Sequence, residues 1–126
     1  MKSLFISTIV VVILITFWVI IFSQVSESVE ILSSLLEDME DKIYNDNWKS
    51  VLDVYKLIND KWTNTSKILM LILDHGEMEK INLALEKLEK YISLKNKSLA
   101  IGEAASLKYL LNHIKEKESL SLKNIF

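Results

Sequence analysis

The feature that most constrains this chain is an uncharged apolar run at residues 4–22. The run begins with Leu4, ends with Phe22, and has sixteen apolar side chains among its nineteen residues. A helix of that length spans about 28 Å, close to the thickness of the hydrocarbon core of a bilayer. The run therefore predicts a transmembrane helix surrounded by lipid, with Trp18 near the far interface, where its indole N–H can meet headgroups.

A cleaved signal peptide is the alternative interpretation of residues 4–22. The apolar part of a signal peptide is normally about 7 to 15 residues long and precedes small residues at a cleavage site. Here the run is longer, and residues 23–28 offer only a poor small-x-small match that ends at Ser28. We therefore expect an uncleaved anchor in the cell membrane.

The charges that flank the run favour one orientation. Lys2 precedes it, whereas residues 23–41 contain no lysine and carry six acidic side chains. Lysine near a span favours the cytoplasmic side of the membrane. We therefore expect residues 1–23 to form a short cytoplasmic N-terminus and a single span, and residues 24–126 to form an extracytoplasmic bundle with a short C-terminal tail.

Residues 24–126 contain four apolar stripes with spacings of three and four, which are typical of helices that bury one face. The first stripe follows the apolar run directly, so its helix is expected to continue the membrane helix. The stripes are Val25, Val29, Leu32, Leu36, Met39 and Ile43; Trp48, Val51, Tyr55, Ile58, Trp62, Thr65, Leu69 and Ile72; Met78, Ile81, Leu85, Leu88 and Ile92; and Ala100, Ala104, Leu107, Leu111 and Ile114. They predict an all-α fold: one N-terminal transmembrane helix followed by a small antiparallel bundle of about four helices.

The first two stripes are separated by Asn45-Asp46-Asn47, three residues that favour turns and helix caps. We expect Asp46 or Asn47 to cap the second helix. Inside that helix, residues 63–66 are short and polar and compete for backbone hydrogen bonds, so the helix is expected to be weakest there.

The later breaks are marked by glycine and by lysine. Gly76 suits the left-handed position that follows a helix, so we expect the second helix to end at His75. Residues 93–98 are rich in lysine and asparagine and are interpreted as a short connection. Residues 119–126 alternate polar and apolar side chains too briefly for an assignment, and either dock as an extended tail or extend freely.

The composition excludes several classes of function. The absence of cysteine excludes a disulfide scaffold and a zinc ribbon, and it is compatible with an oxidising compartment. All 15 basic residues are lysine and the net charge is −2, so there is no electrostatic footprint for nucleic acid. No catalytic residues are recognisable, and we expect no cofactor. The sequence favours a non-catalytic interaction module for another membrane or envelope protein, with self-association as an alternative.

Charge is divided unevenly along the body of the chain. Residues 24–46 hold seven acids and one lysine, whereas residues 47–126 hold ten acids and thirteen lysines. The first body helix is therefore expected either to lie electrostatically against the rest of the bundle or to repel other copies of itself. Simple solvation of two charged faces is the third interpretation.

Two histidines are the weak candidates for a metal or ligand site. In an up-and-down bundle, His75 and His113 would both lie toward the membrane-proximal end, where Glu77 and Glu116 could join them. This arrangement would make a sensor or enzyme the alternative function. No tight ligand spacing supports a metal site, and histidines near helix C-termini commonly stabilise the helix dipole instead.

Trp48, Tyr55 and Trp62 are seven residues apart and therefore share one face of the second helix. An aromatic stripe at helical spacing is more often part of a core than of a ligand cage. These three residues are therefore candidates for the core first and for an interaction surface second.

Several short features, taken with the N-terminal span, resemble one known family. The features are the pair Trp48 and Trp62, the step His75-Gly76-Glu77 followed by Ile81, the pair Tyr91-Ile92, and a C-terminal Ser-Leu-x-Asn-Ile-Phe. They are similar to the small membrane-anchored proteins of spore-forming Firmicutes with the domain of unknown function 4363. The resemblance implies a bacterial membrane location and no known activity. It also implies proximity to multi-pass membrane proteins of the YetF type, which would be the first partners to test.

Overall fold

The computed structural model describes the backbone of residues 1–125, the side chains as far as Lys117, and that of Ser119. Its elements are four helices: α1 (Lys2–Tyr44), α2 (Trp48–Leu69), α3 (His75–Ser93) and α4 (Lys97–Ile125). There is no strand in residues 1–125. The predicted all-α fold is confirmed, including the continuation of the apolar N-terminal helix into the bundle.

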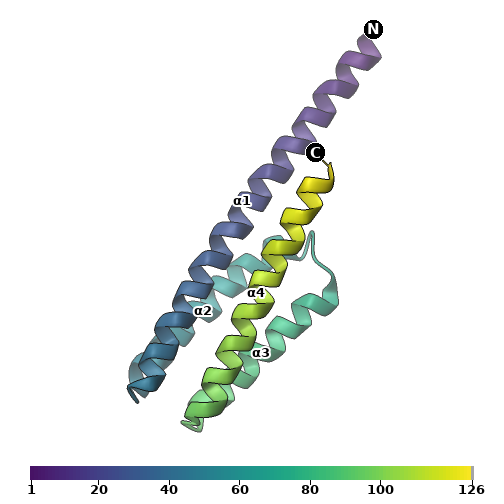
Figure 1. Cartoon of the computed structure of the whole chain (residues 1–126). Helices are drawn as coiled ribbons and strands as arrows, with labels where there is room; N and C mark the ends of the chain where they lie inside the picture. The colour runs from purple at the N-terminus through teal and green to yellow at the C-terminus, as the bar shows by residue number, and fades with distance from the viewer. Residues whose placement is uncertain (126) are drawn as a thin grey trace.

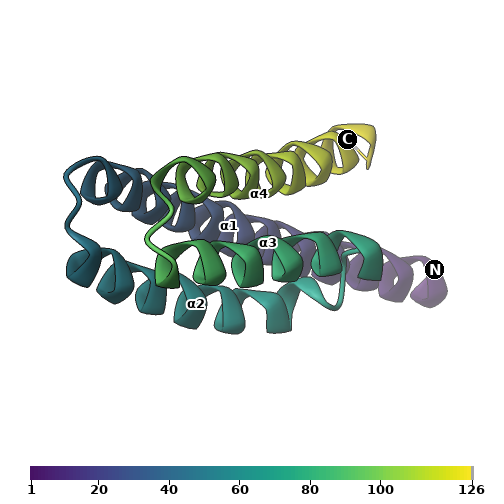
Figure 2. The same cartoon turned by 90° about the horizontal axis from the view of Figure 1, so that it is seen from below.

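The four helices run alternately up and down, and α1 projects far beyond the others at its N-terminal end (Figures 1 and 2). Helix α1 packs against α2 on one side and α4 on the other, and α3 packs against α4 and less extensively against α2. In the described residues, no Cα atoms of the diagonal pairs α1–α3 and α2–α4 approach within 8 Å. The projecting part of α1 therefore leaves the bundle at the end where α2 finishes and α3 begins.

The core contains most members of the stripes that the sequence predicts, together with Ile21, Val54 and Ala84, which those stripes do not include. Leu36, Ile43 and Leu88 are completely buried, and Ala100 and Ala104 let α4 approach its neighbours closely. Two expected stripe members, Trp48 and Ile72, are half-buried at the margin of the core. Burial of one apolar face from each helix supplies the main stabilisation of a bundle of this kind.

The two turns at the end away from the apolar projection have the same geometry. Asp46 (φ 57°) follows α1 and Lys95 (φ 54°) follows α3, each in the left-handed conformation that commonly ends a helix. The N–H of Asn47 donates to the carbonyl of Lys42, and the N–H of Asn96 donates in the same way to Tyr91. Asn47 is the N-cap of α2, as expected, although its side chain makes no capping hydrogen bond.

The turn between α2 and α3 differs from the expectation. Helix α2 ends at Leu69, and α3 begins at His75 with Asp74 as its N-cap. The Asp74 side chain accepts a hydrogen bond from the N–H of Gly76 at 3.4 Å. The prediction that Gly76 adopts the left-handed conformation is therefore wrong, because this glycine lies in the first turn of α3 with a negative φ. The aspartate before it supplies the stronger signal, because a carboxylate can satisfy free N–H groups at a helix start.

Two further stretches are helical. Residues 63–66, the stretch expected to be weakest, lie within α2, and their three hydroxyls donate to helix carbonyls; the Thr65 hydroxyl lies 2.8 Å from the carbonyl oxygen of Lys61. Residues 119–125, left unassigned from the sequence, continue α4 to Ile125. The connection expected at residues 93–98 is shorter, because α3 includes Ser93 and α4 begins at Lys97.

Candidate functional site

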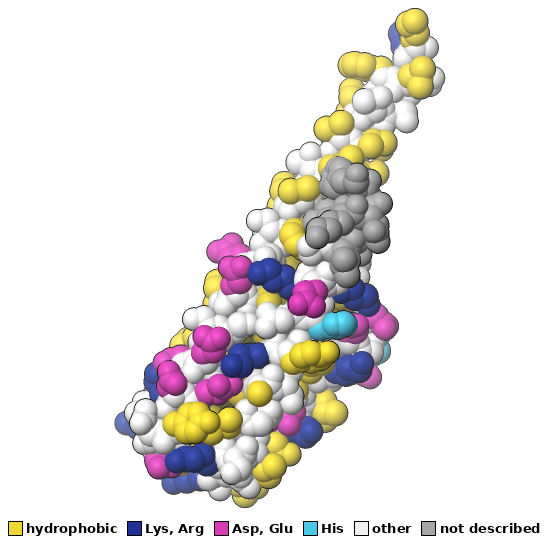
Figure 3. Space-filling model, in the orientation of Figure 1, with side chains coloured by type: hydrophobic (Ala, Val, Ile, Leu, Met, Phe, Trp, Pro, Cys, Tyr) yellow, Lys and Arg dark blue, Asp and Glu magenta, His cyan; other side chains and the backbone are white. Residues whose placement is uncertain are grey.

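The projecting half of α1 is the most distinctive surface of the chain. It is the one helix in the described residues that is long and apolar enough to cross a membrane. Its large side chains face outward, with Leu14 60% exposed and Phe17 59% exposed. In Figure 3, charged side chains cover the bundle, whereas the projection carries apolar and uncharged side chains almost to its tip. Such a surface is consistent with a membrane anchor.

The two threonines of this segment have hydrogen-bond partners within the helix. The hydroxyls of Thr8 and Thr16 each donate to the carbonyl four residues earlier, Leu4 and Val12 respectively, at 2.8 Å. These bonds satisfy the hydroxyls within the helix. The side chain of Trp18, which was expected near the far membrane interface, is half-buried.

The same helix changes character after the apolar segment. From Ile21 onward α1 buries one side chain every three or four residues, first Val25, then Val29 and Leu32. Two of its acids pair with lysines of α4: Glu30 Oε1 lies 2.8 Å from Lys115 Nζ, and Glu40 Oε1 lies 3.1 Å from Lys108 Nζ. The acidic first helix therefore lies against lysines of the more basic part of the chain. Glu30 is exposed, so its pair adds little stability, whereas Glu40 is half-buried; both pairs favour one register between α1 and α4.

A mixed polar cluster joins the start of α3 to α4. Glu77 Oε1 lies 3.9 Å from His113 Nε2 and 3.3 Å from Lys117 Nζ. The His113 ring stacks on Tyr109, with centroids 6.3 Å apart and planes 12° from parallel. Glu77, Tyr109 and His113 line a shallow pocket of about 200 Å³ together with Lys80, Ile81, Leu110 and Ile114. The cluster provides one carboxylate, one imidazole and one ammonium, and the carboxylate is already paired with the Lys117 ammonium.

The four candidates for a metal site do not gather at one place. His75 pairs with Glu79 at 3.1 Å and lines a different pocket from Glu77 and His113. Two residues apart on a helix correspond to about 200° of rotation, so His75 and Glu77 leave α3 on nearly opposite sides. Glu116 is exposed on α4. The described residues contain no group of three or more histidine, aspartate or glutamate side chains that could hold a metal ion.

The expectation that His75 ends the second helix is wrong, because His75 is the first residue of α3. His113 lies inside α4, twelve residues before Ile125, so it is not a C-terminal histidine either. Neither histidine therefore has the helix-end role considered for it.

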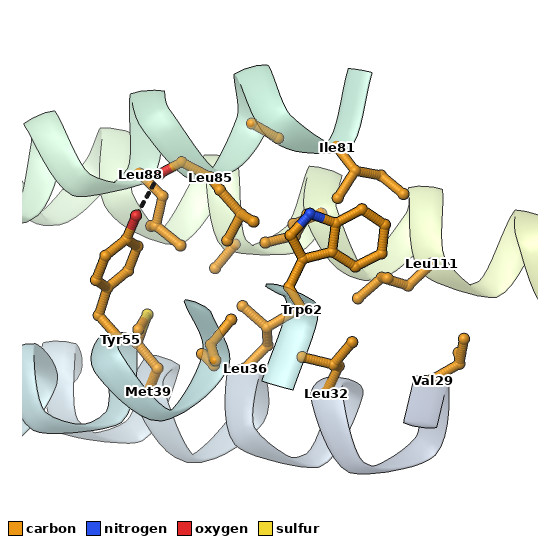
Figure 4. Packing of buried hydrophobic residues seen from close by; sticks show 14 of the residues in the cluster. Val29, Leu32, Leu36, Met39, Tyr55, Trp62, Ile81, Leu85, Leu88 and Leu111 are labelled. Carbon is orange, nitrogen blue, oxygen red and sulfur yellow. Dashed lines mark hydrogen bonds between the residues drawn. The ribbon is translucent and has the colours of Figure 1, made fainter. Parts of the chain in front are cut away.

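The aromatic stripe of α2 faces α3 and the core. Tyr55 and Trp62 are 8% and 4% exposed, and Trp48 is half-buried. The indole ring of Trp62 lies among Leu32 of α1, Ile81 of α3 and Leu111 of α4 (Figure 4). These positions place the stripe in the packing between helices.

Each buried aromatic of α2 has a polar partner on α3. The Trp62 indole N–H donates to Asn82 Oδ1 at 2.8 Å. The Tyr55 hydroxyl lies 3.2 Å from the carbonyl oxygen of Leu85, the bond drawn in Figure 4, and 3.4 Å from Glu89 Oε2. Burial and the adjacent Glu89 carboxylate raise the pKa of Tyr55 from 10.0 to about 12.

The sequence reasoning missed these partners, although a signal for them exists. Tyr55 and Trp62 are seven residues apart on α2, and Asn82 and Glu89 are seven apart on α3. In antiparallel helices, the later residue of one pair faces the earlier residue of the other. Two matched spacings of seven, one aromatic and one polar, can therefore predict this pairing of α2 with α3.

Comparison with known proteins gives one match. The family model described as "Domain of unknown function (DUF4363)" matches residues 19–125, which include the end of the apolar segment and the whole bundle. No curated protein and no solved structure matches the chain. Because the family model covers most of the sequence, the chain belongs to the family with domain of unknown function DUF4363.

Proposed function

We propose that this protein is a single-pass, membrane-anchored helical module that binds another membrane or envelope protein without carrying out chemistry itself. The observation that carries the proposal is the continuity of α1 from Lys2 to Tyr44. Its first part is exposed and apolar, and its later part forms one wall of the core. A bundle built on its own anchor helix is held at the membrane without a flexible linker.

The proposed orientation places the N-terminus inside the cell and the bundle outside. Lys2 is the one basic side chain before the apolar segment, and every charged side chain from the end of that segment to Asp41 is acidic. This distribution follows the positive-inside tendency. In this orientation the charged side chains of the bundle can contact proteins at the outer face of the cell membrane or in the envelope.

The proposed partner is a membrane protein, because the anchor confines the bundle to the same surface. The resemblance to membrane-anchored Firmicutes proteins makes a multi-pass protein of the YetF type the first candidate. A second copy of this chain is the alternative partner.

Amine-reactive crosslinking in native membranes tests the binding role, because exposed lysines such as Lys49, Lys56 and Lys95 cover the bundle. The full chain is crosslinked gently before solubilisation, purified and compared with an unrelated single-pass protein of similar abundance. We expect one partner in stoichiometric amount, found with this chain and absent from the control. Recovery of the chain alone, or with the same background proteins as the control, would contradict the binding role.

A further inference from the structure

The loop between α2 and α3 exposes apolar side chains that the bundle does not use. Residues 70–73 read Met-Leu-Ile-Leu, four apolar residues in succession. Ile72 and Leu73 are half-buried and pack against the core, whereas Met70 is 70% exposed and Leu71 is 76% exposed. Ile72 and Leu73 fix the loop to the bundle, whereas Met70 and Leu71 project from the loop into the surroundings.

This loop lies at the end of the bundle from which the apolar segment of α1 emerges (Figure 1). Helix α2 has 22 residues and runs antiparallel to α1. The same number of residues counted back from Tyr44 along α1 ends at Phe22, about 33 Å away at 1.5 Å per residue. The exposed pair Met70 and Leu71 is therefore level with the end of the expected membrane span.

The C-terminal part of α4 reaches the same level. Lys115 pairs with Glu30 of α1, and α4 continues for ten more residues to Ile125. Ten helical residues extend about 15 Å, so the backbone of α4 approaches the level of residue 20 of α1. Three elements of the structure, α1, the α2–α3 loop and α4, thus converge where the bilayer surface is expected.

The charges around the loop indicate how it would meet a bilayer. Lys67 is exposed in the last turn of α2, and Asp74 and Glu79 are exposed at the start of α3. The loop therefore has no excess of positive charge for attraction to anionic headgroups. Contact would depend on transfer of apolar side chains to the boundary between headgroups and acyl chains.

We propose that Met70 and Leu71 insert into the boundary between headgroups and acyl chains of the bilayer that α1 spans, giving the bundle a second point of attachment. This inference rests on the proposed anchoring by α1. One span alone leaves the bundle free to tilt and to rotate about the axis of α1. A second contact on the α2–α3 loop fixes which face of the bundle points away from the membrane.

The chain has no cysteine, so single cysteines can carry a fluorophore that is sensitive to polarity. Leu71→Cys reports on the loop, and Leu94→Cys is the matched control because Leu94 is 75% exposed in the turn at the opposite end. Val11→Cys, within the apolar segment, reports on the anchor. Each labelled full-length chain is reconstituted into phosphatidylcholine vesicles with and without lipids that carry a nitroxide quencher. Circular dichroism checks that each variant is folded.

The proposal predicts that the label at residue 71 is blue-shifted and quenched, while the label at residue 94 behaves as in water. The difference should persist when phosphatidylglycerol replaces part of the phosphatidylcholine, because the contact is apolar. Met70→Cys provides a second test of the same loop and should behave like Leu71→Cys.

Three outcomes would overturn the proposal, and they are distinguishable from one another. If residue 11 is quenched and residues 70 and 71 are as unquenched as residue 94, the anchor stands and the loop contact is wrong. If residues 71 and 94 are quenched equally, the bundle lies flat on the bilayer and the loop has no special role. If residue 11 is not quenched, the anchor itself fails, and the loop proposal fails with it.

Discussion

At the scale of single residues, Trp62 is a side chain whose contacts join all four helices. It rises from α2, lies among residues of α1, α3 and α4, and donates its indole N–H to Asn82 at 2.8 Å. Loss of the ring removes apolar burial and leaves a cavity. Loss of the hydrogen bond adds less to the cost, because Asn82 is exposed and its amide oxygen can then bond to water.

Replacement of Trp62 by alanine should lower the free energy of unfolding by about 3 to 5 kcal/mol. That is a large part of the roughly 5 to 15 kcal/mol typical of a domain. Thermal unfolding of the full chain in detergent, followed by circular dichroism, measures the change. Trp48→Ala is the control, because Trp48 is half-buried and should cost less. An unchanged melting temperature for Trp62→Ala would contradict the core role and favour a binding role for the aromatic stripe.

Tyr55 should make stability sensitive to alkaline pH. Its pKa is about 12 in the folded chain against 10.0 for the ordinary side chain, because burial and the Glu89 carboxylate disfavour the phenolate. The unfolded chain therefore releases this proton at lower pH than the folded chain does. The contribution is fully present below about pH 10 and is lost as the pH rises toward 12.

Urea unfolding of the wild type and of Tyr55→Phe between pH 9 and pH 11.5 isolates the Tyr55 contribution from the titration of lysines and other tyrosines. We expect the wild type to lose more stability across this range than Tyr55→Phe loses. Equal losses would show that the Tyr55 hydroxyl titrates in the same way in both states.

The two histidines should not bind a metal tightly. His75 and His113 have different carboxylate partners, Glu79 and Glu77, and no third ligand joins either pair among the described residues. A chain purified without chelators should therefore contain well under one metal ion per molecule by elemental analysis. Stoichiometric zinc, lost on His113→Ala, would revive the sensor or enzyme alternative.

At the scale of elements, the apolar spacing predicted the helices because each helix must bury one face. The ends of the helices were harder to predict, because they depend on which backbone groups find partners. Gly76 offered a left-handed residue, yet Asp74 determined the start of α3 by accepting a backbone hydrogen bond. The packing of α2 against α3 also depends on hydrogen bonds between residues far apart in the sequence, Trp62 with Asn82 and Tyr55 with Glu89. Neither Asn82 nor Glu89 stands out in its own local stretch of sequence.

The two asparagines before α2 and α4 give a matched test of helix capping. Asn96 Oδ1 accepts a hydrogen bond from the N–H of Leu99 at 3.1 Å, whereas the side chain of Asn47 makes no capping bond. Asn96→Ala should therefore destabilise the chain by about 0.5 to 2 kcal/mol, and Asn47→Ala should cost less. Both asparagines are exposed, so neither substitution removes much buried surface, and the difference in stability between the two variants reports the capping bond. Equal costs measured by urea unfolding would contradict the capping role of Asn96.

At the scale of the whole molecule, α1 is the element that joins the exposed apolar segment to the bundle. The helix is apolar and exposed near the N-terminus, then buries a stripe from Ile21 to Ile43 against α2 and α4. Its acids Glu30 and Glu40 meet lysines of α4, so the uneven charge of the chain is partly matched within the bundle. If α1 is the proposed anchor, any movement of the bundle relative to the membrane must tilt, bend or unpack this helix, since no linker separates the apolar segment from the bundle.

The central claim, a single span with the bundle outside the cell, is tested most directly by cysteine accessibility in intact cells. Leu94→Cys places a thiol in the turn farthest from the apolar segment, and Ser3→Cys places one before that segment. A membrane-impermeant maleimide is added before or after lysis, and labelling of each thiol is compared. The account predicts that residue 94 is labelled in intact cells and residue 3 only after lysis. Labelling of residue 3 in intact cells, with residue 94 protected until lysis, would contradict it.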